Sequence, residues 1–493
     1  MNNSSNRRLD LRWWYLIYII VVTGILFGLF SQWAYDDPFI TYRYAYNLAH
    51  GVGFVYNPGE YVLSTSTPLF TLLLSVFSFF NVDLPRTAVF IGCLSLAVGG
   101  LFIWDLSQSW GQPLVGLAGI WLYPTFTLLL STLGSETPLY LAFCLGALAC
   151  YARRRYHFTA LLAALAVLTR GDGALLAAVL AAHYLFWVRR PIPWRAVGLF
   201  LAILLPWVIF SWIYFGSPLP VTLMVKQHQG EMAISQRFAA GFVTTVRNYV
   251  SFWQYWVETA LAILGAVYLV GRKRIWGLIL GWTILYFVAY SALGVSRYFW
   301  YYAPLVPGFI VLVGLGINLL VAAGEKAVLK ISVATHISDL VSDPIRNRNI
   351  LAALLVVPLV LAQGQNVYQL RSFSDRRVAV YTTIGEWLQK NSLAQSVVGT
   401  LETGIIGYYA QRPMVDFAGL IQPAVAAQLG PASTYEDSGL WVVKHYHLDY
   451  LVLMDGLFPS LERGFVAEHC QPAKRFTSAE YGYSADLVVY SCN

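Results

Sequence analysis

Charge is scarce in this chain. Only 12% of its 493 residues are Asp, Glu, Lys or Arg, whereas 58% are hydrophobic. Soluble domains carry about 25% charged residues, so the composition excludes a protein that is soluble throughout. It also gives no sign of nucleic-acid binding, because no polar segment carries a basic patch interleaved with aromatic residues. The chain is therefore predicted to be mainly an integral-membrane protein, with the lipid bilayer as a partner.

Cysteine is equally scarce, with five residues and no CxxC metal or redox motif. Cys93, Cys144 and Cys150 lie in apolar runs, where they are interpreted as small core residues. Cys470 and Cys492 lie in the polar C-terminal part and could pair if that part is extracytoplasmic. The sequence leaves that pairing open.

The few charges are unevenly distributed. Residues 1–370 hold 23 Lys and Arg against 13 Asp and Glu, whereas residues 371–493 hold 9 against 12. The basic excess thus belongs to the hydrophobic part, where Lys and Arg in loops set the orientation of membrane helices. Residues 1–370 are predicted to form a membrane module, and residues 371–493 a small polar domain.

The apolar runs predict about eleven membrane-spanning helices. Their approximate ranges are 13–31, 87–106, 112–131, 137–152, 157–169, 173–188, 196–215, 252–270, 275–293, 298–322 and 350–364. A further run, 68–80, covers only about 20 Å as a helix, which is short for a bilayer core of about 30 Å. It is therefore predicted to lie in or dip into the outer leaflet.

The assignment of 68–80 as a helix that does not span also places the basic clusters on one side of the membrane. Arg153–Arg155, Arg189 to Arg195 and Arg272 to Arg274 all fall on the same side as the N-terminus only if 68–80 does not span. Because basic loops stay inside, the N-terminus is predicted to be cytoplasmic and the C-terminal domain extracytoplasmic. That domain should be α/β, with a helix at 378–391, a short helix at "GIIGYYAQR", and strands in "SVVGT", "PMVDF", "YLVLM" and "DLVVYSC".

With this topology, acidic residues gather in the outer loops. These loops carry Asp36, Asp37, Glu60, Asp83, Glu136, Asp172 and Glu231, together with Arg43, Arg170, Lys226 and Arg297. Charged groups at membrane depth are costly and are usually retained for function. The outer face is therefore the predicted location of a functional site.

The first outer loop, residues 32–86, contains two adjacent carboxylates. Asp37 precedes Pro38, a pattern typical of an N-cap and first helical position, in a helix predicted to run to about His50 and to end at Gly51. Asp36 has no such capping duty. Neighbouring acids cannot both ionise easily, so the pKa of one should be raised, which suits a general base. The alternative for Asp36 is an ion pair with Arg43.

Other outer residues also have structural interpretations. Glu136 could simply be an acid favoured at a helix N-terminus. Arg170 and Asp172, in "LTRGDGA", could close a tight turn as an ion pair. Lys226, in "GSPLPVTLMVKQHQGE", is either a phosphate contact or a lysine that snorkels to the interface.

The first loop, "DDPFITYRYAYNLAHGVGFVYNPGEYVLSTSTPLF", resembles a pattern of the GT-C superfamily of integral-membrane glycosyltransferases. That pattern runs D-D-x-x-I-x-x-R-Y-x-x-N-L-x-x-G-x-G-x-V-[FY]-N-x-G-E and then S/T-x-P-L. The nearest resemblance is to actinobacterial cell-wall arabinofuranosyltransferases and related bacterial mannosyltransferase-like proteins. It extends through "GSETPLY", "LTRGDG", "GSPLPVTLMVK" and "IGYYAQRPMVDFAGL". Gly171 departs from the proline frequent in the family, and "VLSTSTP" lacks a usual glycine.

The resemblance implies inverting transfer of a sugar from a polyprenyl-phosphate donor to an extracytoplasmic glycan or lipid acceptor, in the inner or plasma membrane. By similarity, Asp36 is the base and Asp37 assists it. Arg43, Lys226, Arg170 and Arg297 are candidates to surround the leaving phosphate. Glu136 would hold hydroxyls, and Glu60 and Asp172 complete the predicted substrate-binding set. A divalent cation (Mg²⁺, Mn²⁺ or Ca²⁺) could bridge phosphate and carboxylates, although no ligand set in the sequence demands one.

Three other functions compete. A transporter or flippase of lipid-linked sugars would need charges inside the spans or broken helices at the midplane. A scaffold that only presents the C-terminal domain leaves the acidic outer loops unexplained. A ligase or polymerase of lipid-linked glycans would use a different donor. The sugar also stays open between arabinofuranose, mannose and another hexose.

Overall fold

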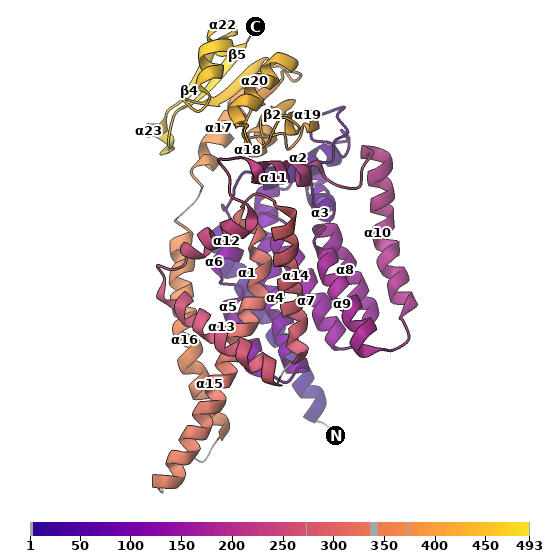
Figure 1. Ribbon diagram of the computed structural model, residues 1–493, viewed down its shortest axis with the longest axis vertical. Helices are drawn as coiled ribbons and strands as arrows, with labels where there is room; N and C mark the ends of the chain where they lie inside the picture. Colours follow the sequence, from indigo (N-terminus) through magenta and orange to yellow (C-terminus); the bar gives the residue numbers. More distant parts are fainter. Residues whose placement is uncertain (1–2, 273, 336–343, 373–374, 493) are drawn as a thin grey trace.

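The structure is a computed structural model that describes residues 3–272, 274–335, 344–372 and 375–492. A long bundle of helices carries a small mixed domain on one end (Figure 1). The N-terminus lies at the opposite end of the bundle from this C-terminal domain. The chain therefore has the predicted architecture of a polytopic helical protein with a C-terminal α/β domain.

Five helices are long and apolar enough to cross a bilayer by themselves. They lie within α1 (Asn3–Phe30), α4 (Leu84–Ser109), α10 (Trp194–Phe215), the segment Phe299–Val328 that includes most of α15 (Val306–Thr335), and α16 (Pro344–Leu370). Shorter apolar helices fill most of the remaining predicted spans. They are α5 (Pro113–Leu122), α7 (Thr137–Ala152), α8 (Tyr156–Thr169), α9 (Gly173–His183), continued by the wider turn η1 (Tyr184–Val188), and α14 (Gly277–Leu293).

Some predicted spans differ in detail. The run 112–131 is interrupted between α5 and α6 (Thr127–Leu130), so it forms two helices. The run 298–322 begins with two short 3₁₀ helices, η3 (Phe299–Tyr301) and η4 (Ala303–Leu305), before α15 starts. The run 252–270 is α13 (Trp253–Arg272), which is followed by a third 3₁₀ helix, η2 (Arg274–Trp276).

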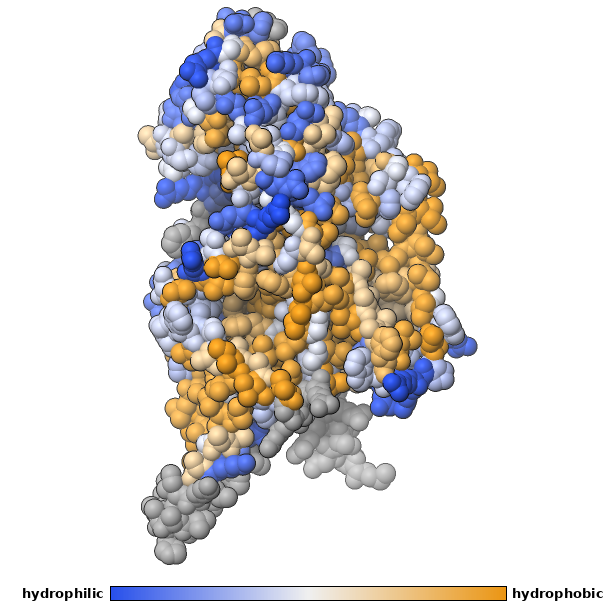
Figure 2. Space-filling view, viewed as in Figure 1, coloured by the Kyte–Doolittle hydropathy of each residue, from blue (hydrophilic) through white to orange (hydrophobic). Residues whose placement is uncertain are grey.

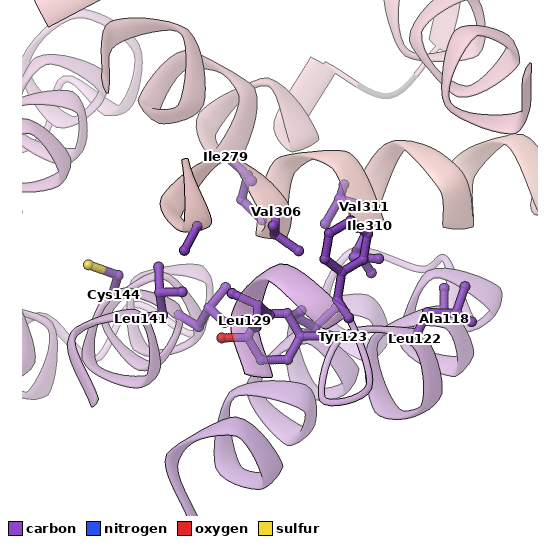
Figure 3. Close-up of a cluster of buried hydrophobic side chains, with 14 of the residues drawn as sticks. Ala118, Leu122, Tyr123, Leu129, Leu141, Cys144, Ile279, Val306, Ile310 and Val311 are labelled. Carbon is purple, nitrogen blue, oxygen red and sulfur yellow. The ribbon is translucent and has the colours of Figure 1, made fainter. Parts of the chain in front are cut away.

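The bundle has the surface of a membrane protein. Apolar residues cover its helices, whereas polar residues concentrate on the C-terminal domain (Figure 2). Inside, α5, α6, α7, α14 and α15 contribute to one continuous apolar core, part of which appears in Figure 3. Tyr123, Leu129 and Leu141 in this core are wholly buried. The exposed basic cluster Arg153–Arg155 follows α7, at the end opposite the C-terminal domain.

Four shorter helices lie at the end of the bundle that faces the C-terminal domain (Figure 1). They are α2 (Pro38–Ala49), α3 (Pro68–Phe79), α11 (Val221–Glu231) and α12 (Phe238–Arg247). The 12 residues of α3 span about 18 Å, too short to cross a bilayer. Its depth in the outer leaflet stays a prediction.

One acid lies inside the bundle, where the sequence reading placed none. Glu258 of α13 is fully buried, and its Oε1 accepts a 2.8 Å hydrogen bond from Gln363 Nε2 of α16. Thr125 in turn donates to Gln363 Oε1 at 2.7 Å. Acids are therefore not confined to the outer loops, and this polar chain joins α13 and α16.

The C-terminal domain contains a five-stranded sheet with the order β2-β1-β3-β5-β4. Its strands are β1 (Val398–Thr400), β2 (Met414–Asp416), β3 (Tyr450–Met454), β4 (Cys470–Phe476) and β5 (Leu487–Cys492). The first three are parallel, and β5 is antiparallel to β3 and β4. Cys470 and Cys492, whose pairing the sequence left open, form a disulfide between β4 and β5. Disulfides persist mainly in oxidising compartments.

Helices surround this sheet. The longest are α17 (Arg377–Asn391) and α20 (Tyr435–His445), and a short helix, α18 (Gly404–Ala410), follows β1. The remaining helical pieces are α19 (Pro423–Ala426), α21 (Pro459–Leu461), η5 (Glu462–Val466), α22 (Ala467–His469) and α23 (Ser478–Tyr481). Of these, α18 packs against α2, so the domain is joined directly to the first outer loop.

Candidate active site

Two cavities lie near the end of the bundle that faces the C-terminal domain, and the second lies between the bundle and that domain. The first has a volume of about 530 Å³ and is lined mainly by apolar atoms. Its apolar walls come from α8, α9, α10 and α14, and they include Val167, Leu175, Trp207, Val208, Ala289 and Leu293. Its polar side includes Asp37, Glu136, Arg170 and Lys226. The first cavity thus combines an apolar channel with a charged end.

The second cavity, of about 660 Å³, is more polar. The bundle side contributes Asp36, Asp37, Lys226, Asn248, Tyr249 and Arg297. The C-terminal side contributes Asp375, Arg377, Glu402, Thr403 and Tyr435. Both parts of the chain are therefore needed to form this cavity.

The ion pair between Asp37 and Lys226 lies where the two cavities meet. Both residues line both cavities, and Asp37 Oδ2 is 3.3 Å from Lys226 Nζ. The lysine side chain is only 6% exposed, and that of Asp37 is 35% exposed. Burial alone would lower the pKa of Lys226, but Asp37 and nearby phenols raise it above its ordinary value. Lys226 is therefore a permanent cation between the cavities.

Aromatic rings surround this cation. The centroid of the Tyr298 ring is 3.7 Å from Lys226 Nζ, and that of Trp300 is 5.7 Å away. Tyr298 and Trp300 stack on each other, and Trp300 stacks on Tyr35. The aromatic segment "SRYFWYYAP" (296–304) thus forms part of the wall that both cavities share, where the ring faces attract the ammonium group.

Local structure holds Lys226 in this place. α11 begins after the proline-rich "GSPLP" segment, and its first N–H, on Val221, donates to Leu63 O at 2.9 Å. The Lys226 carbonyl accepts a 2.8 Å hydrogen bond from Ser296 N. Gly230 allows α11 to approach the 294–296 segment closely, because a Cβ there would overlap Gly294 O. The lysine is thus fixed against the segment that carries its aromatic partners.

The two first-loop acids make different hydrogen bonds from those predicted. Asp37 precedes α2 with Pro38 at its first position, but its side chain makes no capping hydrogen bond. Asp36 caps a helix instead: its Oδ2 accepts from Gly404 N at 3.0 Å and its Oδ1 from Ile405 N at 2.8 Å. These are the first residues of α18. Asp37 therefore holds the predicted N-cap position before Pro38 but makes no capping hydrogen bond, and Asp36 is the more buried and more engaged of the two carboxylates.

Asp36 is also not paired with Arg43. Asp36 is 7% exposed, and burial raises the pKa of its carboxyl to about 6, while the N–H of Ile405 opposes the shift and the charge of Asp37 adds to it. A raised pKa in the pair was predicted from their adjacency, but burial is the larger cause. Gly404 must lack a side chain, because a Cβ there would overlap Asp36.

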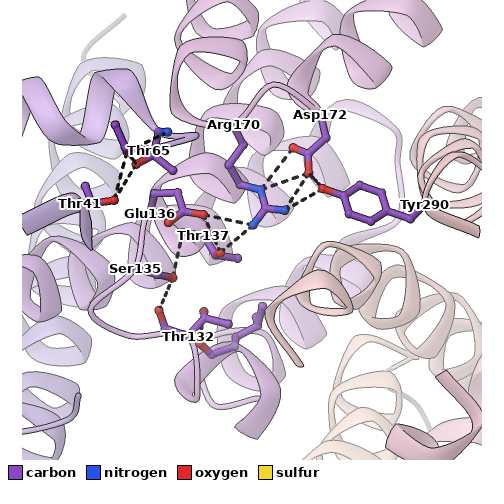
Figure 4. A network of polar contacts seen from close by, with 11 residues as sticks. Thr41, Thr65, Thr132, Ser135, Glu136, Thr137, Arg170, Asp172 and Tyr290 are labelled. Carbon is purple, nitrogen blue, oxygen red and sulfur yellow. Dashed lines mark hydrogen bonds and ion pairs between the residues drawn. The ribbon is translucent and has the colours of Figure 1, made fainter. Parts of the chain in front are cut away.

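Arg170 forms the centre of a buried polar network (Figure 4). Its Nη2 is 2.8 Å from Asp172 Oδ2, and its Nη1 is 3.2 Å from Glu136 Oε1. The same guanidinium donates to Thr137 Oγ1 at 3.1 Å and to Tyr290 OH at 3.1 Å. The predicted Arg170–Asp172 ion pair is confirmed. Burial raises the pKa of Glu136, although Arg170 opposes this.

Threonine hydroxyls line the first cavity beside this network. Thr41 lies 3.2 Å from Thr65 and 3.3 Å from Thr67, and Thr65 lies 3.1 Å from Thr67, measured between Oγ1 atoms. All three residues line the cavity. The "STSTP" stretch (64–68) therefore contributes polar groups to the site.

Two predicted substrate-binding residues lie outside both cavities. Arg43 is 2% exposed, and its guanidinium donates to the carbonyls of Gly407, Tyr56 and Arg412 at 2.8, 3.4 and 3.4 Å. It joins the first loop to the C-terminal domain rather than facing a ligand. Glu60 is exposed and accepts from Asn57 Nδ2 at 3.0 Å. Arg297 does line the second cavity, where it donates to Gln236 Oε1 at 3.1 Å.

Three charged residues of the second cavity were not predicted from the sequence. Arg377 Nη2 is 2.8 Å from Asp375 Oδ2, and its Nη1 is 3.4 Å from Glu402 Oε1. Burial raises the pKa of Glu402, and the charge of Asp36 adds to the shift. A signal for Glu402 was present: it follows strand β1, and ligands of parallel sheets bind at the carboxyl ends of the strands.

No metal centre is evident in the described parts of the chain. Within residues 3–272, 274–335, 344–372 and 375–492, no three His, Cys, Asp or Glu side chains are grouped so that they could hold an ion. Several carboxylates of the second cavity are already engaged, since Asp36 accepts backbone N–H groups and Asp375 pairs with Arg377.

Two crystal structures of ArnT from Cupriavidus metallidurans resemble this chain. The apo structure superposes with a TM-score of 0.64 at 14% sequence identity, covering 98% of both chains. The chain has the fold of ArnT. The ArnT structure bound to undecaprenyl phosphate superposes with a TM-score of 0.61 at 15% identity, covering 97% of this chain and 98% of that one. The expected polytopic helical fold with a small C-terminal α/β domain is thereby confirmed.

Sequence comparisons identify no relative of described function. A family model described as a domain of unknown function (DUF8728) matches residues 366–490. This range corresponds to the end of α16 and nearly all of the C-terminal domain. No curated protein matches the chain. The likeness to ArnT, at 14–15% identity, therefore concerns the fold, and the chemistry rests on the site itself.

Proposed function

We propose that this protein is an inverting glycosyltransferase that moves a sugar from a polyprenyl-phosphate donor to a glycan or lipid acceptor. The observation that carries this proposal is the Asp37–Lys226 ion pair at the junction of an apolar cavity and a polar one. A lipid-linked donor and a hydroxyl-bearing acceptor require two such compartments, with a base and a cation where they meet.

The first cavity suits the donor. Its apolar walls from α8, α9, α10 and α14 match a polyprenyl chain, and most of the surface of α10 is exposed, as expected of a lipid-facing helix. Lys226 lies at the charged end, where the phosphate would bind. Arg170 also lines the cavity, but its own carboxylate, hydroxyl and phenol partners occupy its guanidinium. The undecaprenyl phosphate bound to ArnT, a protein of the same fold, is in keeping with this choice of donor.

The second cavity suits the acceptor. Its carboxylates can accept hydrogen bonds from sugar hydroxyls, and its amides can both donate and accept them. Tyr249, Tyr435 and Trp300 offer ring faces for stacking. Since Asp375, Arg377 and Glu402 come from the C-terminal domain, that domain helps to bind the acceptor. Arg297 contributes from the bundle side.

The chemistry requires one proton transfer. Asp37, as general base, takes the proton of the acceptor hydroxyl, whose oxygen attacks the anomeric carbon from the face opposite the phosphate. The bond between that carbon and the phosphate oxygen breaks, and polyprenyl phosphate leaves. Because the second pKa of a phosphate monoester is about 6, the leaving group needs no general acid. Lys226 stabilises the charge that develops on it. Asp36 supports Asp37 by fixing α18 beside it.

The cellular setting follows from the same reading. The protein is proposed to reside in the inner or plasma membrane, with its N-terminus cytoplasmic and both cavities on the outer side. The acceptor is a glycan or lipid of the cell envelope, and the sugar is arabinofuranose, mannose or another hexose.

Reconstituted transfer tests the proposal. Purified protein in proteoliposomes is given radiolabelled polyprenyl-phosphate arabinofuranose or polyprenyl-phosphate mannose, with an oligoarabinofuranoside or oligomannoside as acceptor. We expect label to move from the lipid to the oligosaccharide with one of these donors, and not from a nucleotide sugar. Movement of intact labelled lipid between leaflets, without consumption of any donor, would contradict the proposal and favour a flippase.

A further inference from the structure

Two anions compete for the single positive charge of Lys226: the carboxylate of Asp37 and the phosphate of the proposed donor. In the structure its Nζ is 3.3 Å from Asp37 Oδ2, and the same side chain faces the cavity assigned to the donor. In the proposed reaction, Asp37 must accept a proton and Lys226 must hold the phosphate. The ion pair therefore occupies both groups when no donor is bound.

We propose that the donor phosphate releases the base: it draws Lys226 Nζ away from Asp37 Oδ2, which then becomes available to the acceptor hydroxyl. This inference rests on the proposed function and adds a control to it. The base is held until the donor is in place, so donor binding precedes productive acceptor binding.

The surroundings of Lys226 permit such an exchange. An ammonium group has three donors and rotates about a flexible stem, and the described contacts of this one are a single carboxylate oxygen and aromatic rings. The Tyr298 ring, 3.7 Å away, can keep contact with the cation while it turns from one anion to the other. The hydroxyl of Tyr298 donates to Gln229 Oε1 at 3.0 Å, which fixes the ring.

Arg170, the other cation that lines the first cavity at its charged end, is unsuited to this exchange. Its guanidinium bonds to Asp172, Glu136, Thr137 and Tyr290 at once, so a phosphate could not displace one partner without disturbing the rest. A planar guanidinium with fixed donor directions also shifts less readily than an ammonium. The exchange is thus specific to Lys226.

Reciprocity makes the proposal testable by binding alone. If the phosphate weakens the Asp37–Lys226 pair, then removing the charge of Asp37 must strengthen phosphate binding by the same factor. The variant Asp37→Asn should therefore bind undecaprenyl phosphate about tenfold more tightly than the wild type, within the usual range of such couplings, although it should not transfer sugar.

The experiment measures the Kd of undecaprenyl phosphate, in detergent, for wild type, Asp37→Asn, Lys226→Gln and the double variant. We expect tightening in Asp37→Asn, weakening in Lys226→Gln, and no tightening when Asp37→Asn is added to Lys226→Gln. Glu60→Gln, which removes a charge from the same loop outside both cavities, should bind like the wild type. Asp37→Ser provides a second variant should Asp37→Asn fold poorly.

Two results would overturn the inference. If Asp37→Asn leaves the Kd unchanged, the phosphate and Asp37 do not compete for Lys226. If the tightening persists in the Lys226→Gln background, simple repulsion between two anions explains it. In both cases the wild type still binds the lipid, so the proposed function stands. Absence of lipid binding by the wild type would instead contradict the proposed function, and the inference with it.

Discussion

Replacing Asp37 with Asn is expected to lower kcat for sugar transfer by about 10²–10⁴-fold, the usual contribution of a general base. Asn keeps the size of the side chain and removes its ability to take the acceptor proton. Because Asp37 is partly exposed and makes no capping hydrogen bond to α2, the protein should fold normally. Single-turnover assays with saturating donor, using the donor and acceptor found active in proteoliposomes, measure the loss.

The matched variant is Asp36→Asn, one residue away. Asp36 holds two N–H groups of α18, and an amide can accept both only through a single oxygen. Leaving a buried N–H without an acceptor costs about 1–3 kcal/mol, so the thermal stability should fall. The loss of transfer should be much smaller than in Asp37→Asn. A dead Asp36→Asn beside an active Asp37→Asn would assign the base to Asp36, as the sequence alone predicted.

Replacing Arg170 with Gln is expected to destabilise the protein severely. The change leaves Asp172 and Glu136 buried without their cation, with side chains only 8% and 15% exposed. Removing one partner of a buried ion pair costs about 3–5 kcal/mol. The midpoint of thermal unfolding in detergent should drop markedly, and the yield of folded protein should fall with it.

A second ion pair serves as the control. Arg153 pairs with Asp105 at the opposite end of the bundle, where their side chains are 41% and 28% exposed. Exposed pairs contribute about 0–1 kcal/mol, so Arg153→Gln should unfold nearly like the wild type. If Arg170→Gln were as stable as Arg153→Gln, the Arg170 network would not support the site in the way described.

The membrane part of the fold was largely predictable. Apolar runs locate helices because a bilayer allows few alternatives, and α1, α4, α10 and α16 lie where the runs predicted. The break between α5 and α6 was not predicted, although Pro124 lies at it and a proline disfavours the interior of a helix. In the C-terminal domain, β4 was missed since its Gln, Pro, Lys and Arg residues lack the alternation of a strand.

The site was predicted only in part, because its key contacts join distant residues. The motif drew attention to Asp36 and Asp37, but their roles depend on Gly404 and Lys226. Local rules assigned the cap to Asp37 because Pro38 follows it, and no local pattern shows that α18 docks on Asp36. Arg43 was misread for the same reason: its acceptors Gly407 and Arg412 lie in the C-terminal domain.

Lys226 illustrates the opposite outcome. From the sequence, Lys226 could be either a phosphate contact or a lysine that snorkels to the interface. The structure places it at 6% exposure beside Asp37 and between the two cavities, which excludes a solvent-facing ammonium. Burial and the neighbouring anion, neither of which the sequence displays, argue against the snorkelling lysine, and the phosphate contact stays a proposal.

The most direct test of the account is a cryo-EM structure of the protein with undecaprenyl phosphate. We expect a phosphate oxygen within hydrogen-bond distance of Lys226 Nζ, a separation of Asp37 Oδ2 from Lys226 Nζ longer than 3.3 Å, and the lipid chain along α8, α9, α10 and α14. A phosphate bound instead at Arg297 or Arg377 in the second cavity, with the Asp37–Lys226 pair intact, would contradict it.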